Sequence, residues 1–129
     1  MLPYLAKKLA EVRNCTQRLG EFAQDQTTNT TPKLIYSLDL SDSTFIFVRM
    51  LVCGVEDGGI NRCRFLYDFC VFNNGGIAII EDDTLYGLLP DKKTHEDFDV
   101  VVDTSGASLE IKVKGIGAVV NWFIKLEIL

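Results

Sequence analysis

The sequence predicts a mainly β protein: an antiparallel β-sandwich of jelly-roll type, preceded by one N-terminal α-helix. Beyond residue 33, segments that alternate apolar and polar side chains recur at intervals of about ten residues, as the strands of a sandwich do. Asp-Gly, Asn-Gly and Gly-Gly pairs, which favour tight turns, separate several of these segments. The first 23 residues differ, because their apolar residues recur at spacings of three and four, the period of an amphipathic helix.

Length and composition indicate one domain with its own core. The chain has 129 residues, of which 47% are hydrophobic, enough to form a core without disulfides or metals. A net charge of −5 disfavours binding along the phosphate backbone of nucleic acid. No apolar run reaches the roughly 20 residues of a membrane span, and the N-terminus lacks the apolar core of a secretory signal. We therefore expect no nucleic-acid partner, no membrane insertion and synthesis in the cytoplasm.

The cysteine and histidine content argues against a metal or cofactor site. Four cysteines, at positions 15, 53, 63 and 70, form no CxxC pair, and the single histidine, His95, cannot complete a usual zinc site. Cys63 and Cys70 lie seven positions apart in a predicted strand, so they face opposite sides of it. We expect free thiols, no metal and no cofactor.

Residues 1–23 are predicted to form the N-terminal helix. Leu5, Leu9, Val12 and Leu19 follow a heptad spacing that makes one side of the helix apolar. Three arrangements are consistent with this pattern. The helix packs on its own domain, gathers several chains in a parallel coiled coil, or docks on a different protein. In the last two arrangements the helix is a stem or an anchor.

Residues 24–32 are predicted to be a linker. Their sequence, QDQTTNTTP, has no large apolar residue, and its proline disfavours helix at the preceding residue. This change in composition is the boundary that the sequence indicates, and residues 33–129 form the predicted β-sandwich domain.

The β domain is predicted to consist of short strands joined by tight turns. Asp57–Gly58–Gly59, Asn73–Gly76 and Asp103–Gly106 are the clearest turn signals, and residues 90–97 read as a polar loop. Gly115–Ile116–Gly117 predicts a hairpin between the last two strands. The predicted strands are residues 34–40, 44–56, 61–72, 77–80, 84–89, 98–102, 109–114 and 120–128.

Two of these strands, around residues 45–52 and 63–72, carry apolar residues on both faces. One face of each lies in the core, so the other needs cover, either from a second subunit or from a loop or helix of the same chain. Together with the heptad, this pattern favours self-association. The predicted oligomer interface consists of Leu5, Leu9, Val12, Leu19, Phe45, Phe47, Phe65, Tyr67 and Phe69.

The sequence contains no recognisable catalytic constellation. His95 lies among charged residues in DKKTHED, which indicates a solvated loop, and no Gly-x-Ser-x-Gly nucleophile elbow is present. Glu81 and Asp83 belong to an acidic turn, and neighbouring carboxylates there point in different directions rather than flanking a sugar bond. We predict that the protein is not an enzyme.

Several segments of the β domain occur in a distinctive order: VRMLVCGVEDGG, RFLYDFCVFNNGG, DFDVVVDTSGASLEIKVKGIG and the ending VVNWFIKLEIL. Residues 34–129 resemble a domain found at the ends of tailed-bacteriophage structural proteins, especially tail fibres, tail spikes and virion appendages. The glycines and aromatic residue that carry the resemblance are Gly54, Gly58, Gly75, Gly76, Gly115 and Trp122. The resemblance implies a β-sandwich, commonly trimeric, that serves as a head or attachment module and has no catalytic residues.

We therefore predict a non-enzymatic virion structural protein, the head of a homotrimeric fibre or appendage with a role in host attachment. Its predicted partners are other copies of itself, other virion proteins through the N-terminal helix, and a host surface glycan. A monomeric carbohydrate-binding module is the alternative, and the oligomeric state distinguishes the two. The candidate contact residues on polar loops and exposed aromatics are Asp57, Asn61, Asn73, Asn74, Tyr86 and His95, with Phe98 as a second aromatic for stacking on a sugar.

Overall fold

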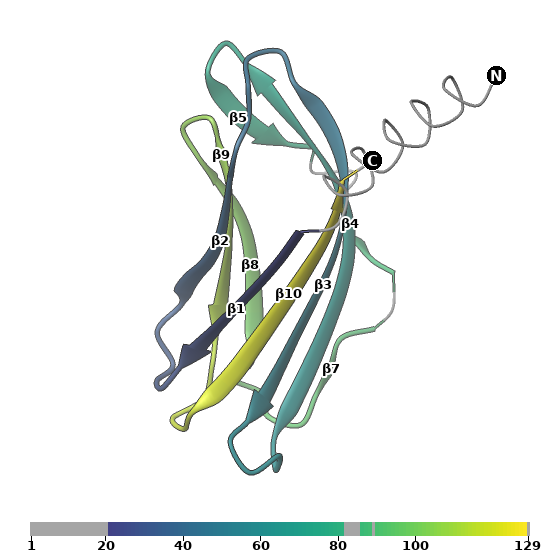
Figure 1. Cartoon of the computed structure of the whole chain (residues 1–129). Coiled ribbons are helices and arrows are strands. Elements are labelled where there is room, and N and C mark those ends of the chain that lie inside the picture. The colour runs from purple at the N-terminus through teal and green to yellow at the C-terminus, as the bar shows by residue number, and fades with distance from the viewer. Residues whose placement is uncertain (1–20, 82–85, 89, 129) are drawn as a thin grey trace, which may run out of the picture.

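The computed structural model describes residues 21–81, 86–88 and 90–128, and the regular structure in these ranges is entirely β (Figure 1). The predicted mainly β class is therefore confirmed. The strands are β1 (Glu21–Thr27), β2 (Lys33–Asp39), β3 (Phe45–Glu56), β4 (Arg62–Asn74), β5 (Ile77–Ile80), β6 (Tyr86–Gly87), β7 (Lys92–Lys93), β8 (Asp99–Ser105), β9 (Ser108–Lys114) and β10 (Val120–Ile128).

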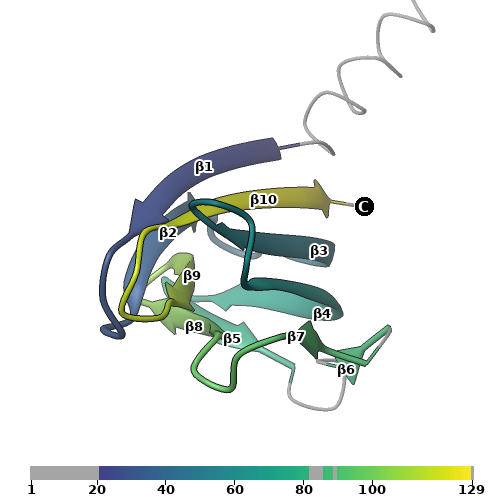
Figure 2. The same cartoon turned by 90° about the horizontal axis from the view of Figure 1, so that it is seen from below.

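The strands form two antiparallel sheets that share one core. The large sheet has the order β1-β10-β3-β4-β5, with the short β6 and β7 also paired to β4, and the small sheet has the order β2-β9-β8. Viewed along its strands, the large sheet curls like a half-barrel around the small sheet (Figure 2). We call the side of the large sheet that faces the small sheet its inner face, and the opposite side its outer face.

The core fills the space between the two sheets. On β9, Leu109, Ile111 and Val113 are fully buried while the alternating Glu110 and Lys112 are not, as the two-residue period predicted. The side chains that meet them from the inner face of the large sheet are Val48, Met50, Val52, Phe65, Phe69, Val71, Val120, Trp122, Ile124 and Leu126.

Three predicted turns are confirmed as hairpins of the observed topology. Gly58 and Gly59 have φ values of 90° and 75° between β3 and β4, and Gly75 and Gly76 have 65° and 93° between β4 and β5. Gly106, with φ of 56°, turns the chain between β8 and β9. These backbone angles are strained for residues with a Cβ, so glycine determines where each hairpin turns.

The predicted hairpin at Gly115–Ile116–Gly117 is wrong. β9 ends at Lys114 in the small sheet, whereas β10 begins at Val120 in the large sheet, so the residues between them cross from one sheet to the other. Neither glycine has a positive φ. Gly115 is required for space instead, because a Cβ at this position would collide with Oγ1 of Thr27.

Trp122 is the centre of this crossing region. Its Nε1 donates a hydrogen bond to Thr27 Oγ1 at 2.8 Å, and its indole meets the Phe98 ring edge-on with centroids 5.9 Å apart. A Cβ on Gly54 would lie 2.8 Å from indole Cζ3, so β3 approaches the ring closely. Phe98 is fully buried, which corrects its prediction as an exposed aromatic. The cause is packing against Trp122, which the local sequence does not reveal.

The structure shows a strand, β1, where the sequence predicted the end of the helix and the beginning of the linker, so both predictions are wrong for residues 21–27. Residues 21–27 form an edge strand paired to β10, with Phe22 opposite Lys125 and Thr27 opposite Val120. Its inward positions carry Ala23, Asp25 and Thr27, so the strand lacks the apolar alternation by which other strands were recognised. The rest of the predicted helix lies outside the described residues. β7 similarly forms within the predicted polar loop 90–97.

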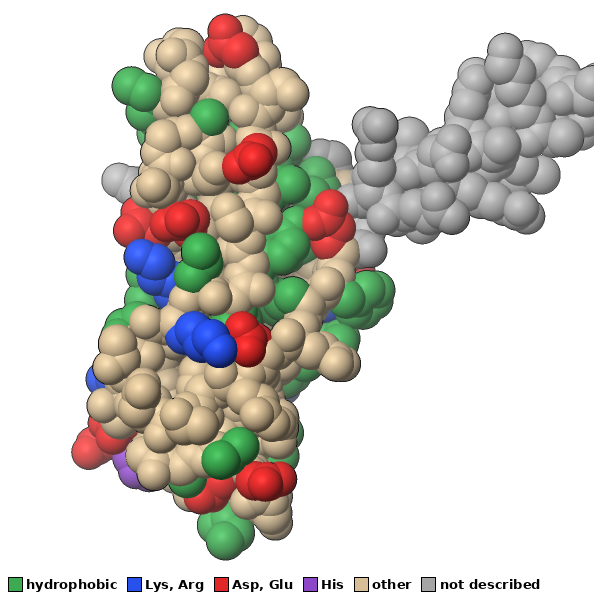
Figure 3. All heavy atoms as spheres, turned by 60° about the vertical axis from the view of Figure 1, so that its left-hand side comes forward, with side chains coloured by type: hydrophobic (Ala, Val, Ile, Leu, Met, Phe, Trp, Pro, Cys, Tyr) green, Lys and Arg blue, Asp and Glu red, His purple; other side chains and the backbone are tan. Residues whose placement is uncertain are grey.

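A polar contact links the two sheets along the β1–β2 flank. Nζ of Lys33 donates to Asp25 Oδ1 at 2.8 Å and to the Gln26 carbonyl at 2.9 Å. Acidic and basic side chains lie next to one another on the flank that comes forward in Figure 3, without a large field of one sign. Within the described ranges, no helix is long and apolar enough to cross a membrane.

Candidate functional site

The outer face of the large sheet carries the most distinctive surface chemistry of the described residues. The register sets which side chains point outward. Phe45 is opposite Phe72 and Cys53 is opposite Arg64 in the β3–β4 pairing, whereas the alternating Val52 is buried. The odd-numbered residues of β3 and the even-numbered residues of β4 therefore form this face, together with the matching positions of β1, β10, β5 and β7.

One end of the outer face is apolar. The rings of Phe45 and Phe72 lie 6.1 Å apart between centroids, and Ile79 of β5 is opposite Phe72. Phe45 of β3 is 60% exposed, and Ile77 and Ile79 of β5 are 63% and 47% exposed, so large apolar side chains meet water on both sides of the half-buried Phe72 of β4. We define the apolar end as Phe45, Phe47, Phe72, Ile77 and Ile79.

An ion pair separates the apolar end from the rest of the face. Nε and Nη2 of Arg49 donate to Oδ1 and Oδ2 of Asp68 at 2.9 and 3.1 Å. Asp68 is only 2% exposed, and the two-point pairing satisfies both oxygens of its buried carboxylate. The side chain of Arg49 is 46% exposed. The outer face thus changes from apolar to polar along the strands.

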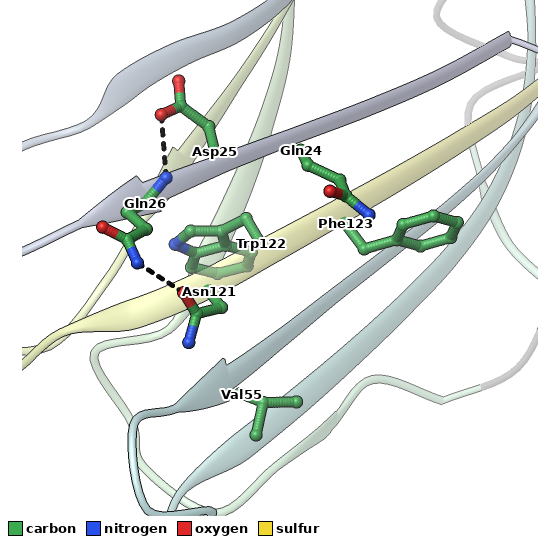
Figure 4. Close-up of a pocket in the computed structure, with 7 residues that line it drawn as sticks. All are labelled: Gln24, Asp25, Gln26, Val55, Asn121, Trp122 and Phe123. Carbon is green, nitrogen blue, oxygen red and sulfur yellow. Dashed lines mark hydrogen bonds between the residues drawn. The ribbon is translucent and has the colours of Figure 1, made fainter.

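The opposite end of the outer face is hollowed on its β1–β10 side (Figure 4). A depression of about 560 Å³ is lined by side chains from β1, β10 and β3. The Gln26 amide donates to Asn121 Oδ1 at 2.7 Å, leaving other amide groups of Gln24, Gln26 and Asn121 to solvent. Phe123 stands beside them and meets Phe22 with ring centroids 5.6 Å apart. We call this hollow the amide depression; amides offer hydrogen-bond donors and acceptors, and the rings offer apolar area.

A second depression, of about 500 Å³, adjoins the first on the β4–β7 side, and Val55 lines both. Cys53, Val55 and Cys63 contribute apolar atoms, while the walls are basic. Arg64 is opposite Lys92 in the β4–β7 pairing, and Arg62 is two positions along β4 on the same face. We define Arg62, Arg64 and Lys92 as the cationic end. Lys93 and Thr94 also line the depression.

The structure places the predicted interface residues in different environments. Phe45 and Phe47 lie on the outer face, and Tyr67 is half-buried, with its hydroxyl donating to Asp91. Phe65 and Phe69, at 1% and 0% exposure, belong to the core, which corrects their assignment to an interface. Both faces of the strand are apolar, and the sequence did not determine which one turns inward. The heptad residues Leu5, Leu9, Val12 and Leu19 lie outside the described residues.

The predicted contact residues do not form one surface. The turns at 57–61 and 73–76 lie at opposite ends of β4, whose 13 residues span about 40 Å. Asp57 and Asn74 are exposed, and His95 is half-exposed in its loop. Of Tyr86, the structure establishes that its backbone pairs with Asp68.

Two of the predicted contact asparagines have structural roles. Asn73 is 1% exposed, donating to the Leu40 carbonyl and accepting from the Gly76 amide, which corrects its prediction as a surface contact. Asn61 is half-buried and donates through both its backbone amide and Nδ2 to Glu56 Oε2. Turn asparagines commonly bond to their own turn, as both do here, and Asn73 is also held by the Leu40 carbonyl, which is distant in sequence.

The cationic end and the amide depression were not predicted. Arg62 and Arg64 alternate with Cys63, a pattern that marks two basic residues on one face of a strand. Lys92 joins them only through the β4–β7 pairing across nearly thirty residues of chain. Gln24 and Gln26 were assigned to a linker because no apolar alternation accompanies them.

Burial shifts the pKa of several groups. Burial raises the pKa of the Cys63 thiol to about 12 and also raises the pKa of Cys53. For Tyr67, burial and then the hydrogen bond to Asp91 raise the pKa of the phenol. The three described cysteines are free thiols, and Cys63 and Cys70 lie on opposite faces of β4, as predicted. No cluster of three His, Cys, Asp or Glu side chains suited to a metal occurs among the described residues; Asp83 lies outside them.

Two of the solved structures that resemble the chain in fold are tailspike proteins. The tailspike protein of Acinetobacter baumannii phage AM24 matches with 8% identity and a TM-score of 0.47, over 88% of this chain and 26% of that one. The tailspike protein gp49 of Acinetobacter baumannii bacteriophage Fri1, a capsular polysaccharide depolymerase, matches with 11% identity and a TM-score of 0.39, over 87% of this chain and 18% of that one. The chain thus spans about a quarter or less of either tailspike protein.

No protein-family model matches the chain, and no curated protein does. Likeness at these values of identity and TM-score says nothing of what this chain binds or catalyses.

Proposed function

We propose that the protein is a non-enzymatic structural domain of a tailed-bacteriophage particle, and that its copies assemble as a homotrimer through the apolar end of the outer face. The observation that carries this proposal is the exposure of Phe45 on β3 and of Ile77 and Ile79 on β5, the two strands that flank β4. Contiguous exposed apolar side chains of this kind are uncommon on monomers, because covering them releases about 25 cal/mol for each Å² removed from water.

The particle assignment is supported by the order of turns and strands that resembles phage fibre and appendage domains. The residues that carry this resemblance, Gly54, the two glycine turns and Trp122, each have a structural function in the fold. In this proposal the residues before β1, with their heptad, contact other virion proteins. A host surface glycan is the proposed target.

Light scattering tests self-association directly. We expect the full chain to have three times its 14.4 kDa mass. The double variant Phe45→Ser, Ile79→Ser removes apolar area from the proposed interface while leaving the core unchanged, so its mass should fall to that of one chain. Ile60→Ser is the matched control, because Ile60 is 74% exposed in the β3–β4 turn, away from this face, and its trimer should persist.

Other outcomes locate the contact elsewhere or remove it. A trimer that survives the double variant but dissociates in Leu9→Ser places the contact in the heptad and contradicts the role of the apolar end. A monomeric unaltered chain contradicts the trimer and favours the second candidate function.

The second candidate is a monomeric carbohydrate-binding module, and the amide depression is the observation that favours it. Three amide side chains border an open hollow next to Phe123, so both sugar hydroxyls and a sugar face could find partners. A titration with host surface polysaccharide tests it. Gln26→Ala should lower the affinity while Asn74→Ala, which removes an exposed amide at the other end of β4, should not. Equal affinities in both variants would contradict sugar binding at this hollow.

A further inference from the structure

The cationic end contains three basic side chains that have no acidic partner among the described residues. Arg62 and Lys92 are exposed, and Arg64 is half-buried between them. The ion pairs of the described residues involve Lys33, Arg49, His95, Lys112 and Lys125. Positive charge is thus concentrated here on a chain whose net charge is −5.

Nearby acidic and basic groups already have other partners. Both carboxylate oxygens of Asp91 accept the Tyr67 hydroxyl, at 2.8 and 2.9 Å. Glu56 Oε2 accepts two bonds from Asn61. Lys93, although it lines the same depression, donates its Nζ to the carbonyls of Glu96 and Phe98. These contacts leave Arg62, Arg64 and Lys92 as the cations that a ligand can meet.

The side chain of Arg64 contains a hydrogen-bond donor that is not satisfied by the described residues. Its Nε is buried and has no hydrogen-bond acceptor among the described residues, and among the same residues its Nη2 bonds only to the Pro90 carbonyl, at 3.4 Å. Buried donors are nearly always paired, and an unpaired one in a native protein calls for an acceptor. The Arg64 guanidinium is therefore held in the wall of a 500 Å³ depression with donors that the described protein atoms do not fully satisfy.

We propose that the cationic end is a binding site for a small oxyanion, a carboxylate or a phosphate. A guanidinium presents paired N–H donors that match the two oxygens of either group, and an ammonium adds a mobile point charge. Arg64 binds the anion with its planar fork, while Arg62 and Lys92 neutralise the remaining charge from either side. The apolar atoms of Cys53 and Val55, which line the depression, limit competing hydration. This site does not depend on self-association, since it lies at the opposite end of the outer face from Phe45 and Ile79.

Two-dimensional NMR of the full chain tests the proposal, with sodium glucuronate and inorganic phosphate as probes, glucose as the neutral control and ionic strength held constant. We expect saturable shifts of the Arg64 Nε–H signal and of the Lys92 amide, with a dissociation constant on the order of 1 mM, and no response to glucose. A response to glucuronate alone identifies a carboxylate ligand, and a response to phosphate alone identifies a phosphate ligand. Either result supports the site.

Four variants control for charge and folding. Arg64→Gln should weaken binding about tenfold or more, and Arg64→Lys should recover only part of it, because the charge returns without the fork. Lys92→Gln, on the exposed two-residue β7, provides the same test with little risk to folding. Lys112→Gln is the matched control, since it removes one positive charge from the far side of the small sheet.

Two results would overturn the proposal. One is the absence of any saturable shift with either anion. The other is an equal loss of affinity in Lys112→Gln and in the Arg64→Gln and Lys92→Gln variants, because it would mean that only the overall charge of the protein matters.

Discussion

Trp122 and Phe123 are neighbours in β10 but face opposite sides of the large sheet, and their surroundings differ completely. Trp122 on the inner face is 2% exposed, bonded to Thr27 and packed edge-on against Phe98. Phe123 on the outer face is half-buried and contacts Phe22, itself 61% exposed. Both faces carry aromatic side chains, yet among the described residues only those of the inner face are enclosed between two sheets. The inner face stabilises the fold, and the outer face is the surface on which we propose that binding occurs.

Truncating these two neighbours tests that difference with the largest expected effect. Trp122→Ala should lower the free energy of unfolding by about 3–5 kcal/mol, because it leaves a cavity between the sheets and removes the partner of Thr27. Phe123→Ala should cost less than about 1.5 kcal/mol, mostly the lost ring contact with Phe22. Urea unfolding measures both. Equal losses would contradict the assignment of inner and outer faces.

The glycines of the crossing between the sheets provide the next test. Gly115→Ala forces a Cβ against Thr27 and should destabilise the protein by about 1–3 kcal/mol. At Gly117 a Cβ meets nothing within 4 Å, so Gly117→Ala should change the unfolding free energy by less than about 1 kcal/mol, and in the stabilising direction. Thermal or urea unfolding distinguishes the pair. A tolerated Gly115→Ala would mean that Thr27 does not approach this backbone.

The Cys63 thiol on the inner face predicts a loss of stability in alkali. Its pKa is raised by burial from 9.0 to about 12, so the unfolded chain loses this proton at lower pH than the folded one. The stabilisation is complete below pH 9 and declines as the pH rises toward 12. Between about pH 8 and about pH 10 the folding equilibrium constant should fall roughly tenfold from this group. Urea midpoints of the unaltered chain and Cys63→Ala measure it, and parallel pH profiles would refute the contribution.

The Arg49–Asp68 pair on the outer face should have a moderate effect. Asp68→Ala removes a buried carboxylate whose two bonds hold Arg49, and we expect a loss of about 1 kcal/mol, limited because Arg49 can be rehydrated. Glu127→Ala breaks the exposed contact with Lys125 and should cost less than about 0.5 kcal/mol. Chemical unfolding compares the two. A larger loss from Glu127→Ala would indicate that burial of Asp68 does not matter.

The smallest effect is expected at the flank that links the sheets. Lys33 beside Asp25 holds the pKa of that carboxyl below its usual value of 3.8. The stabilisation is therefore present above pH 3.8 and is lost as the pH falls through the lower folded pKa. Both side chains are partly exposed, so water screens the pair. The difference in urea midpoint between the unaltered chain and Lys33→Met should be small near pH 5 and vanish in stronger acid, whereas a constant difference would argue for packing instead.

Sequence periodicity predicted most of the β domain because the relevant information is local. The strands β2, β3, β4, β5, β8, β9 and β10 coincide broadly with predicted segments. The positions of three turns could be predicted from glycines, since the ability to adopt a positive φ depends on a single residue. β1 and β7 were missed because edge strands paired mainly through their backbones need no apolar alternation.

The candidate site could be predicted only in part. The two-sided strands indicated that one apolar face remains outside, and Phe45 and Phe47 lie on it. Phe65 and Phe69 were placed on that face wrongly, because two apolar faces of one strand are equivalent until pairing selects one. The cationic end needed Lys92 beside Arg64, a contact across nearly thirty residues of chain.

The sequence by itself determined that the chain after residue 33 is rich in strands, where its tight turns lie, and that two strands are apolar on both sides. Only the tertiary structure decided that Gly115 crosses between sheets instead of turning a hairpin, which face of β4 is buried, and which polar groups meet on the outer face. The physical reason is that alternation and φ preference act within a few residues, whereas sheet order and burial result from contacts between segments distant in sequence.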